Sequence, residues 1–71
     1  MKTLTREEER LAREIASKLG DLHSLASHRK YVKIYSEKRL REAMVKALAV
    51  KEEDVLVSRG AIFTGILKSD H

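Results

Sequence analysis

The chain of 71 residues has no cysteine, proline, tryptophan, asparagine or glutamine, and it has only one phenylalanine and two tyrosines. Without cysteine it forms neither disulfides nor thiolate metal sites, and an intracellular compartment is the default. With so few aromatic side chains, the core has to be built from Leu, Ile, Val and Ala, which suits closely packed helices. The lack of Asn and Gln in a chain with 37% charged residues is typical of thermophile proteins and of idealised designs.

Long hydrophobic runs are also absent. No apolar stretch approaches the ~20 residues that span a bilayer, and the N-terminal MKTLTREEER lacks the apolar segment of a signal peptide. We therefore expect a cytoplasmic protein with no membrane partner. Residues 1–71 suffice for a single small domain but scarcely for a water-excluding catalytic pocket, so we expect no enzymatic activity, no cofactor and no small-molecule substrate.

The net charge of +4 is concentrated in the centre of the chain. Residues 28–46 carry seven basic and two acidic side chains, whereas residues 1–27 carry five of each and residues 47–71 carry three basic and four acidic ones. A central excess of this size calls for a physical reason.

The first helix is predicted from its N-cap to its terminating glycine. Thr5 and Glu8 have the spacing of a capping box, and Gly20 is suited to the left-handed conformation that ends many helices. Between them, one stripe at helical spacing contains the apolar residues Leu11, Ala12, Ile15, Ala16 and Leu19. Asp21 is a candidate cap for the segment that follows.

A helix is also predicted after Ser36, which is a good N-cap. It contains two ion pairs at i,i+4 spacing, Glu37 with Arg41 and Glu42 with Lys46. Its outer face is expected to carry Lys38, Arg39 and Lys46. Its apolar face consists of Leu40, Ala43, Met44, Ala47 and Leu48.

Residues 22–35 do not form one clean amphipathic helix. On a wheel of about 100° per residue, Arg29 and Lys33 fall inside the apolar stripe that Leu22 and Val32 belong to. Three arrangements remain open: the long basic side chains extend outward, the helix breaks near residues 28–30, or KYVKIY is extended with Val32 and Ile34 facing inward.

Residues 51–58 are predicted to form a connection with a short turn. Val55, Leu56 or Val57 is expected to fill part of the core from this connection. Ser58 is then a suitable cap for a last helix that runs to about Lys68.

The segment VLV-SRGA-IFTGIL could instead form a β-hairpin, because periodicity does not separate strand from helix in short apolar runs. We favour the helix, since it places Ile62, Phe63, Ile66 and Leu67 on one side, whereas a strand would divide them. The predicted fold is therefore all-α, a compact bundle of three to four short helices. The runner-up is an α+β, winged-helix-like fold with strands near 30–35, 55–57 and 61–66.

The central basic segment is the first candidate site. Lysine and arginine side chains bind nucleic-acid phosphates through the release of counterions, and Tyr31 and Tyr35 could stack on unpaired bases. A charged face of this kind can also be plain solvated surface, or can bind an acidic protein. The predicted nucleic-acid-binding residues, for DNA or RNA, are Arg29, Lys30, Lys33, Lys38, Arg39 and Lys46.

The last helix carries the second and third candidate sites. Its far side is nearly bare of side chains, which lets a partner helix or a second copy of the chain come close. The predicted partner interface consists of Ala61, Thr64 and Gly65. A predicted anion-binding site at the start of the helix consists of Ser58, Arg59 and Gly60. Alternatively, Gly60 eases a tight turn and Gly65 fits close packing inside the domain.

The stretch REIASKLG followed by DLHSLASHRKY resembles a helix-turn-helix, the DNA-binding motif whose second helix reads the major groove. Four residues match its pattern, namely Ile15, Ala16, Leu19 and Gly20. The second half departs from it, because Asp21 and Arg29 stand at positions that are normally apolar.

His23 and His28 are candidate metal ligands or catalytic groups only by residue type. On one helix they would point about 140° apart, and no cysteine is available to complete a site. The neighbouring Ser24 and Ser27 do not by themselves make a catalytic constellation, so we predict ordinary surface or half-buried histidines.

Overall fold

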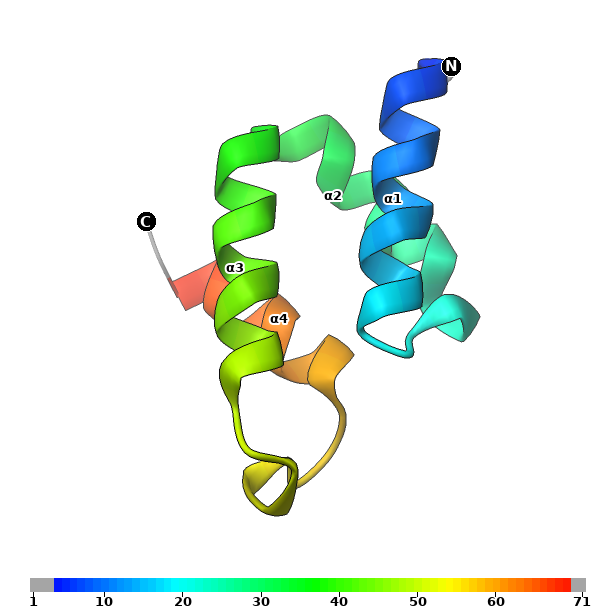
Figure 1. The fold of residues 1–71 in the computed structure, drawn as a ribbon. Coiled ribbons are helices and arrows are strands. Elements are labelled where there is room, and N and C mark those ends of the chain that lie inside the picture. Colours follow the sequence, from blue (N-terminus) through cyan, green and yellow to red (C-terminus); the bar gives the residue numbers. More distant parts are fainter. Residues whose placement is uncertain (1–3, 70–71) are drawn as a thin grey trace.

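A computed structural model describes residues 4–69, and over this range it contains α-helices, short 3₁₀ helices and no strand. In the view of Figure 1, α1 and α3 form the front layer and α2 and α4 lie behind them. α1 packs mainly on α2, and α3 mainly on α4. The elements in chain order are α1 (Arg6–Lys18), η1 (Leu22–Ser24), α2 (Leu25–Ile34), α3 (Glu37–Ala49), η2 (Glu52–Asp54) and α4 (Arg59–Ser69). The all-α prediction is confirmed, and the winged-helix alternative with its C-terminal hairpin is wrong.

The helix ends follow the signals in the sequence. Thr5 Oγ1 accepts a hydrogen bond from the backbone N–H of Glu8 at 3.0 Å, and Glu8 Oε1 accepts one from the backbone N–H of Thr5 at 2.9 Å. Ser36 and Ser58 each accept a hydrogen bond from the backbone N–H three residues later, at 3.2 and 3.0 Å. The predicted capping box and both serine caps are therefore confirmed.

Gly20 ends α1 in the left-handed conformation, with φ of 66°. The backbone N–H of Gly20 donates to Ser17 O at 3.1 Å, and that of Asp21 donates to Ala16 O at 2.7 Å. These two bonds are the Schellman arrangement, in which the residue after the glycine is tied back to the last turn of the helix. The turn therefore fixes the position of Asp21, whose side chain is buried rather than capping η1.

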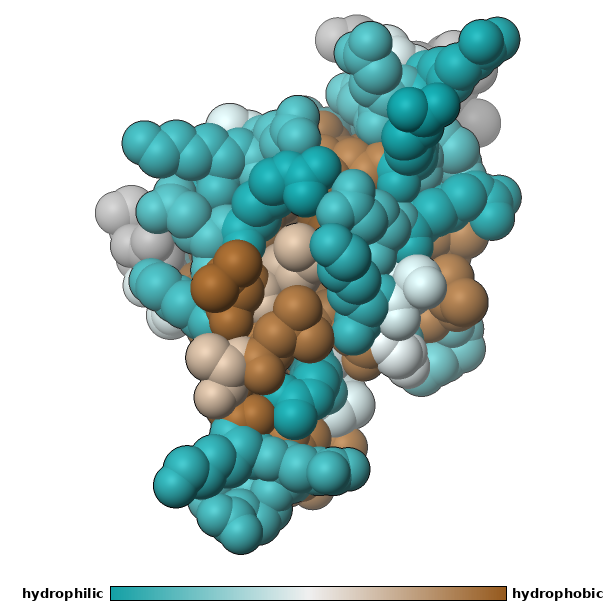
Figure 2. All heavy atoms as spheres, viewed as in Figure 1, coloured by the Kyte–Doolittle hydropathy of each residue, from teal (hydrophilic) through white to brown (hydrophobic). Residues whose placement is uncertain are grey.

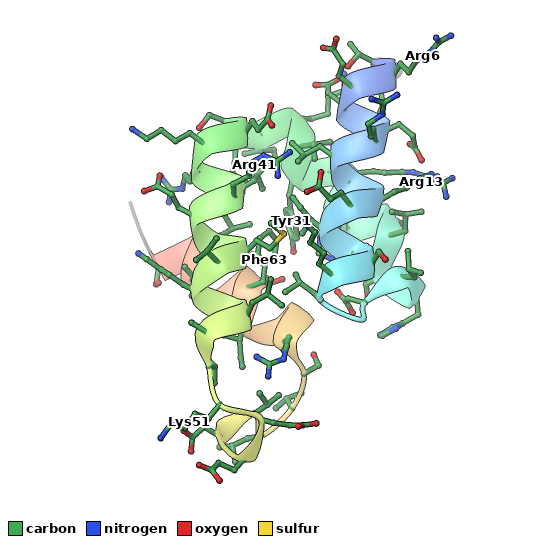
Figure 3. The ribbon with its side chains drawn as sticks, viewed as in Figure 1. Arg6, Arg13, Tyr31, Arg41, Lys51 and Phe63 are labelled. Atoms are coloured by element: carbon green, nitrogen blue, oxygen red, sulfur yellow. The ribbon has the colours of Figure 1, made fainter. Side chains whose placement is uncertain are left out.

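The core lies between the two layers and is centred on Phe63, which is fully buried. Phe63 comes from α4 and reaches the rings of α2, with its centroid 5.5 Å from His28 and 6.3 Å from Tyr31. In Figure 3, Tyr31 and Phe63 both lie in the space between α1 and α3. The rest of the buried apolar cluster consists of Leu11, Ala12, Ile15, Leu19, Val32, Leu40, Ala43, Met44, Ala47 and Leu67.

α2 is one continuous helix, so the suggested break at residues 28–30 and the extended KYVKIY segment are wrong. Residues 22–24 form a separate 3₁₀ turn, and α2 begins only at Leu25. Without Leu22, which is exposed, the inner face of α2 is centred on His28 and Val32. Arg29 and Lys33 then lie at the edge of that face, and Ile34 points to solvent.

The connection between α3 and α4 does not fill the core, contrary to the prediction. Leu56 and Val57 are 93% and 83% exposed, and Val55 is half-buried outside the core cluster. The connection projects beyond the end of the bundle, as the lower loop in Figure 1 shows. The side chains of Leu56 and Val57 therefore lie outside the core.

Gly60 is the point where α4 meets the turn between α1 and α2. A Cβ atom at this position would overlap the carboxylate of Asp21, whereas one at Gly65 would meet nothing within 4 Å. Glycine at position 60 is thus required by a close approach, and the suggestion that Gly65 serves close packing inside the domain is wrong. Gly65 lies on the exposed side of α4.

Substitution by alanine should have opposite effects on the stability of the protein at Gly60 and at Gly65. Gly60→Ala should lower the free energy of unfolding by about 1–3 kcal/mol, because the methyl group displaces a buried carboxylate. Gly65→Ala should raise it by about 0.5–1 kcal/mol, because alanine favours the helix and the site is open. Urea unfolding followed by circular dichroism measures both, and a Gly60→Ala protein as stable as the parent would contradict the packing described here.

Candidate functional site

Arg29 and Lys33, two of the predicted nucleic-acid-binding residues, bind carboxylates of α1. Arg29 Nε and Nη2 donate to the two oxygens of Glu9 at 3.0 and 2.9 Å, and Lys33 Nζ donates to Glu8 Oε1 at 2.9 Å. The hydrogen bond from Arg29 lowers the pKa of Glu9 below its usual 4.5. The pKa of Glu8 is also lowered, first by the backbone N–H of Thr5 and then by Lys33.

Arg41 connects α3 to α1 in the same way. Its Nη1 donates to Glu14 Oε2 at 2.9 Å, and its Nε donates to Glu37 at 2.8 Å, as the i,i+4 spacing predicts. Figure 3 shows the Arg41 side chain pointing from α3 towards α1. The hydrogen bonds from Arg41 and then from Lys18 lower the pKa of Glu14 to about 2. Much of the central positive charge is therefore matched by the acidic face of α1.

The side chains of Arg39 and the two tyrosines contact other residues of the bundle. Arg39 Nη2 donates to Leu67 O at 3.0 Å, near the C-terminal end of α4, and its guanidinium lies 5.2 Å from the ring centroid of Tyr35. Tyr31 packs against the rings of His28 and Phe63. Both tyrosines are half-buried, and their rings contact Phe63 in the case of Tyr31 and the Arg39 guanidinium in the case of Tyr35.

Lys30, Lys38 and Lys46 are exposed and make no ion pair with another residue in the described range 4–69. The predicted pair between Glu42 and Lys46 is not formed. Lys30 lies on α2, and the other two lie on the outer side of α3. The six predicted residues therefore do not form one continuous basic strip, and nucleic-acid binding stays a prediction.

The predicted anion site at the start of α4 is not assembled as the sequence suggested. Arg59 Nη1 donates to Ala47 O and Val50 O, both at 2.8 Å, so this side chain closes the C-terminal end of α3. Ser58 caps α4, and Gly60 faces the Asp21 carboxylate. The negative group beside the start of α4 is thus the protein's own Asp21 carboxylate. The positive end of the helix dipole favours a negative charge at this position.

A polar groove with a volume of about 330 Å³ lies between α2, η1 and the first turns of α4. Buried Asp21 and His28 form its floor. The hydroxyl oxygens of Tyr31 and Thr64 approach to 3.5 Å from opposite walls. The groove is lined by Asp21, His23, Ser24, Ser27, His28, Tyr31, Ser58, Gly60, Ala61 and Thr64.

Two histidines share the Asp21 carboxylate. His28 Nε2 lies 2.8 Å from Oδ2, and His23 Nε2 lies 3.2 Å from Oδ1. Both histidines can reach Asp21 because His23 belongs to η1 and not to α2. The prediction that they point apart on a single helix is therefore wrong. The prediction that His28 is a surface or half-buried residue is also wrong, since it is 1% exposed.

The buried Asp21–His28 pair does not have the geometry of a catalytic base. Because a carboxylate accepts, Nε2 of His28 carries the proton in their hydrogen bond. The remaining nitrogen, Nδ1, is buried and has no hydrogen-bond partner among the described residues, so a substrate in the groove cannot reach it. In the described part of the chain, no three His, Cys, Asp or Glu side chains are grouped to hold a metal ion.

Comparisons with protein-family models, curated proteins and solved structures find no match to this chain. Within residues 4–69, no helix has the length and apolar character needed to cross a membrane.

The ion pairs of α1 predict a specific response to acid. The folded-state pKa of Glu14, about 2, lies below its usual 4.5. Ionised Glu14 thus stabilises the folded chain, and this contribution is complete above pH 4.5 and is lost as the pH falls through 2. Glu14→Gln should flatten the decline in stability over this pH window, measured by urea unfolding at several pH values.

Glu53→Gln is the matched control, because Glu53 is exposed and makes no ion pair within the described range. It should leave the pH dependence unchanged. Identical pH profiles for Glu14→Gln and the parent would show that the contact with Arg41 has no effect on stability.

Proposed function

We propose that this chain is a non-enzymatic protein-interaction module that seats a helix of a partner protein along the small-residue face of α4. The proposal is supported by the groove between α2 and α4, whose lining includes the exposed Ala61, and by Gly65, which is exposed on α4 beside the groove residue Thr64. Ala61 and Gly65 are one helical turn apart, so they lie on the same side of α4.

The space above Gly65 supports the proposal. No atom lies within 4 Å of the position that a Cβ would take, so no neighbouring helix of this chain accounts for the glycine. A glycine in an exposed helix interior costs about 0.5–1 kcal/mol relative to alanine. Close approach of another backbone is a physical reason for accepting that cost, because the helix axes can come nearer where side chains are missing.

The chemistry of the groove favours a protein partner. Its walls present hydroxyl groups from Ser27, Ser58 and Thr64, together with the half-buried ring of Tyr31. Neutral hydroxyls and an aromatic ring suit a surface that is partly apolar and partly hydrogen-bonding, as in protein interfaces. By contrast, Arg29 and Lys33 are held by carboxylates of α1, which weakens the case for phosphate binding.

A helical-peptide library displayed on phage tests the proposal. Clones are selected on the parent protein and measured by titration calorimetry against two variants. Gly65→Leu fills the open face without disturbing the core, and it should weaken binding at least about tenfold, because the partner backbone can no longer approach. Lys51→Leu adds the same side chain on the distant connection and should bind as the parent does.

If selected peptides bind Gly65→Leu as tightly as the parent, the small-residue face is not the binding site. A selection that yields no binder to the folded parent would also count against the proposal.

Nucleic-acid binding is the second candidate function, and three exposed lysines favour it. Lys30, Lys38 and Lys46 lack a carboxylate partner within residues 4–69 and are available to phosphates. On this hypothesis, Lys38→Ala and Lys46→Ala should each reduce the dependence of log K on log salt by about one phosphate contact. Arg29→Ala should have a smaller effect, because Glu9 already neutralises that side chain.

Fluorescence anisotropy with short single- and double-stranded oligonucleotides measures these slopes. The second candidate is rejected if no oligonucleotide binds at about 0.15 M salt, where non-specific binders still show dissociation constants of ~10⁻⁴ to 10⁻⁶ M.

A further inference from the structure

The outer side of α3 has an apolar centre that the bundle does not cover. Val45 is 61% exposed and Leu48 is 39% exposed, and Ala49 beside them is also exposed. Figure 2 shows apolar side chains gathered over the middle and lower part of α3, with hydrophilic residues around them. Val45 lies in a shallow depression together with Arg41, Glu42 and Lys46. Single exposed apolar residues are common, but a contiguous patch on one helix indicates an interaction surface.

Charges are distributed unequally on the two sides of this patch. Lys38, which precedes it on α3, has no carboxylate partner within residues 4–69, whereas the connection that follows carries Glu52, Glu53 and Asp54. These three acids are exposed and make no ion pair within the described part of the chain. Beside the apolar centre, the charges without an ion-pair partner in this part of the chain therefore include Lys38 at one end and three acids at the other end.

A second copy of the same surface is complementary to it when the two α3 helices run antiparallel. If a two-fold axis passes between Val45 and Leu48, the N-terminal part of α3 in one copy lies towards the connection that follows α3 in the other copy. Lys38 of each copy then meets the acidic connection of the other copy, and Glu42 lies close to Lys51 of the other copy. A parallel arrangement would bring like charges together, which is unfavourable.

We infer that the chain associates with a second copy of itself through this face of α3, as a two-fold symmetric antiparallel pair. A two-fold contact uses the same patch on both copies, so one self-complementary surface is sufficient. α3 has 13 residues and is about 20 Å long. An interface of that length belongs to the small, weak class, so the dimer should form only at high protein concentration.

Sedimentation equilibrium on the full chain, from about 10 µM to about 1 mM, tests the inference. The mass should rise from 8.1 kDa towards twice that value. Val45→Glu should leave the protein monomeric throughout this range, because it places a charge at the centre of the patch. Circular dichroism checks that the variant is folded, which is expected for an exposed helical position.

Charge reversal tests the antiparallel register. Lys38→Glu and Asp54→Lys should each weaken dimerisation about tenfold or more, because each brings like charges together. The double variant should restore it to near the parent level. Lys30→Glu, a reversal on α2 away from the patch, is the control and should have little effect.

A parent protein that stays monomeric up to about 1 mM would overturn the inference. So would a Val45→Glu protein that still dimerises, because the contact would then use another surface. A double variant that dimerises less than either single variant would overturn the antiparallel register. The inference does not depend on the α2–α4 groove, so a peptide bound at Gly65 should not alter the mass dependence.

Discussion

The close contact between the start of α4 and the Asp21–His28 pair is the constraint on which the rest of the bundle depends. The Schellman turn at Gly20 holds Asp21 in place, and Asp21 accepts a hydrogen bond from buried His28 of α2. Because Gly60 has no side chain, α4 can lie against this pair and bring Phe63 into the core. A buried polar pair contributes little net stability but is costly to disrupt, so it favours one arrangement over its competitors.

A row of glutamates on α1 explains the excess of positive charge in the middle of the chain. Glu8 and Glu9 bind Lys33 and Arg29 of α2, and Glu14 binds Arg41 of α3. Partly exposed pairs of this kind each contribute little to stability. They do fix which faces of α2 and α3 turn towards α1. The basic composition therefore serves the fold to a large extent, and the proposed function rests on the remaining surfaces.

The sequence predicted α1, α3 and α4 well, because the start of each carries a local signal. The capping box at Thr5, the serine caps and the terminating Gly20 act through neighbouring residues, and all of them were recognisable. The inner face of α2 could not be recognised in this way. A helical wheel that includes Leu22 gives the wrong orientation for this face, because residues 22–24 form a separate 3₁₀ turn. The partners of Arg29, Arg59 and Asp21 were also beyond prediction, since these contacts join segments whose packing no local pattern specifies. Gly60 was predicted to belong to an anion-binding site with Ser58 and Arg59, but the carboxylate that lies against it is the protein's own Asp21.

The closure of α4 over the Asp21–His28 pair can be tested on the His28 ring in solution. A long-range ¹H–¹⁵N NMR spectrum of the imidazoles reports which ring nitrogen carries the proton and whether that proton exchanges with water. The structure predicts a proton on Nε2 of His28 that is protected from exchange by Asp21 and by the packing of α4. A His28 ring whose Nε2 proton exchanges as fast as that of exposed His23 would show that α4 does not close over this pair.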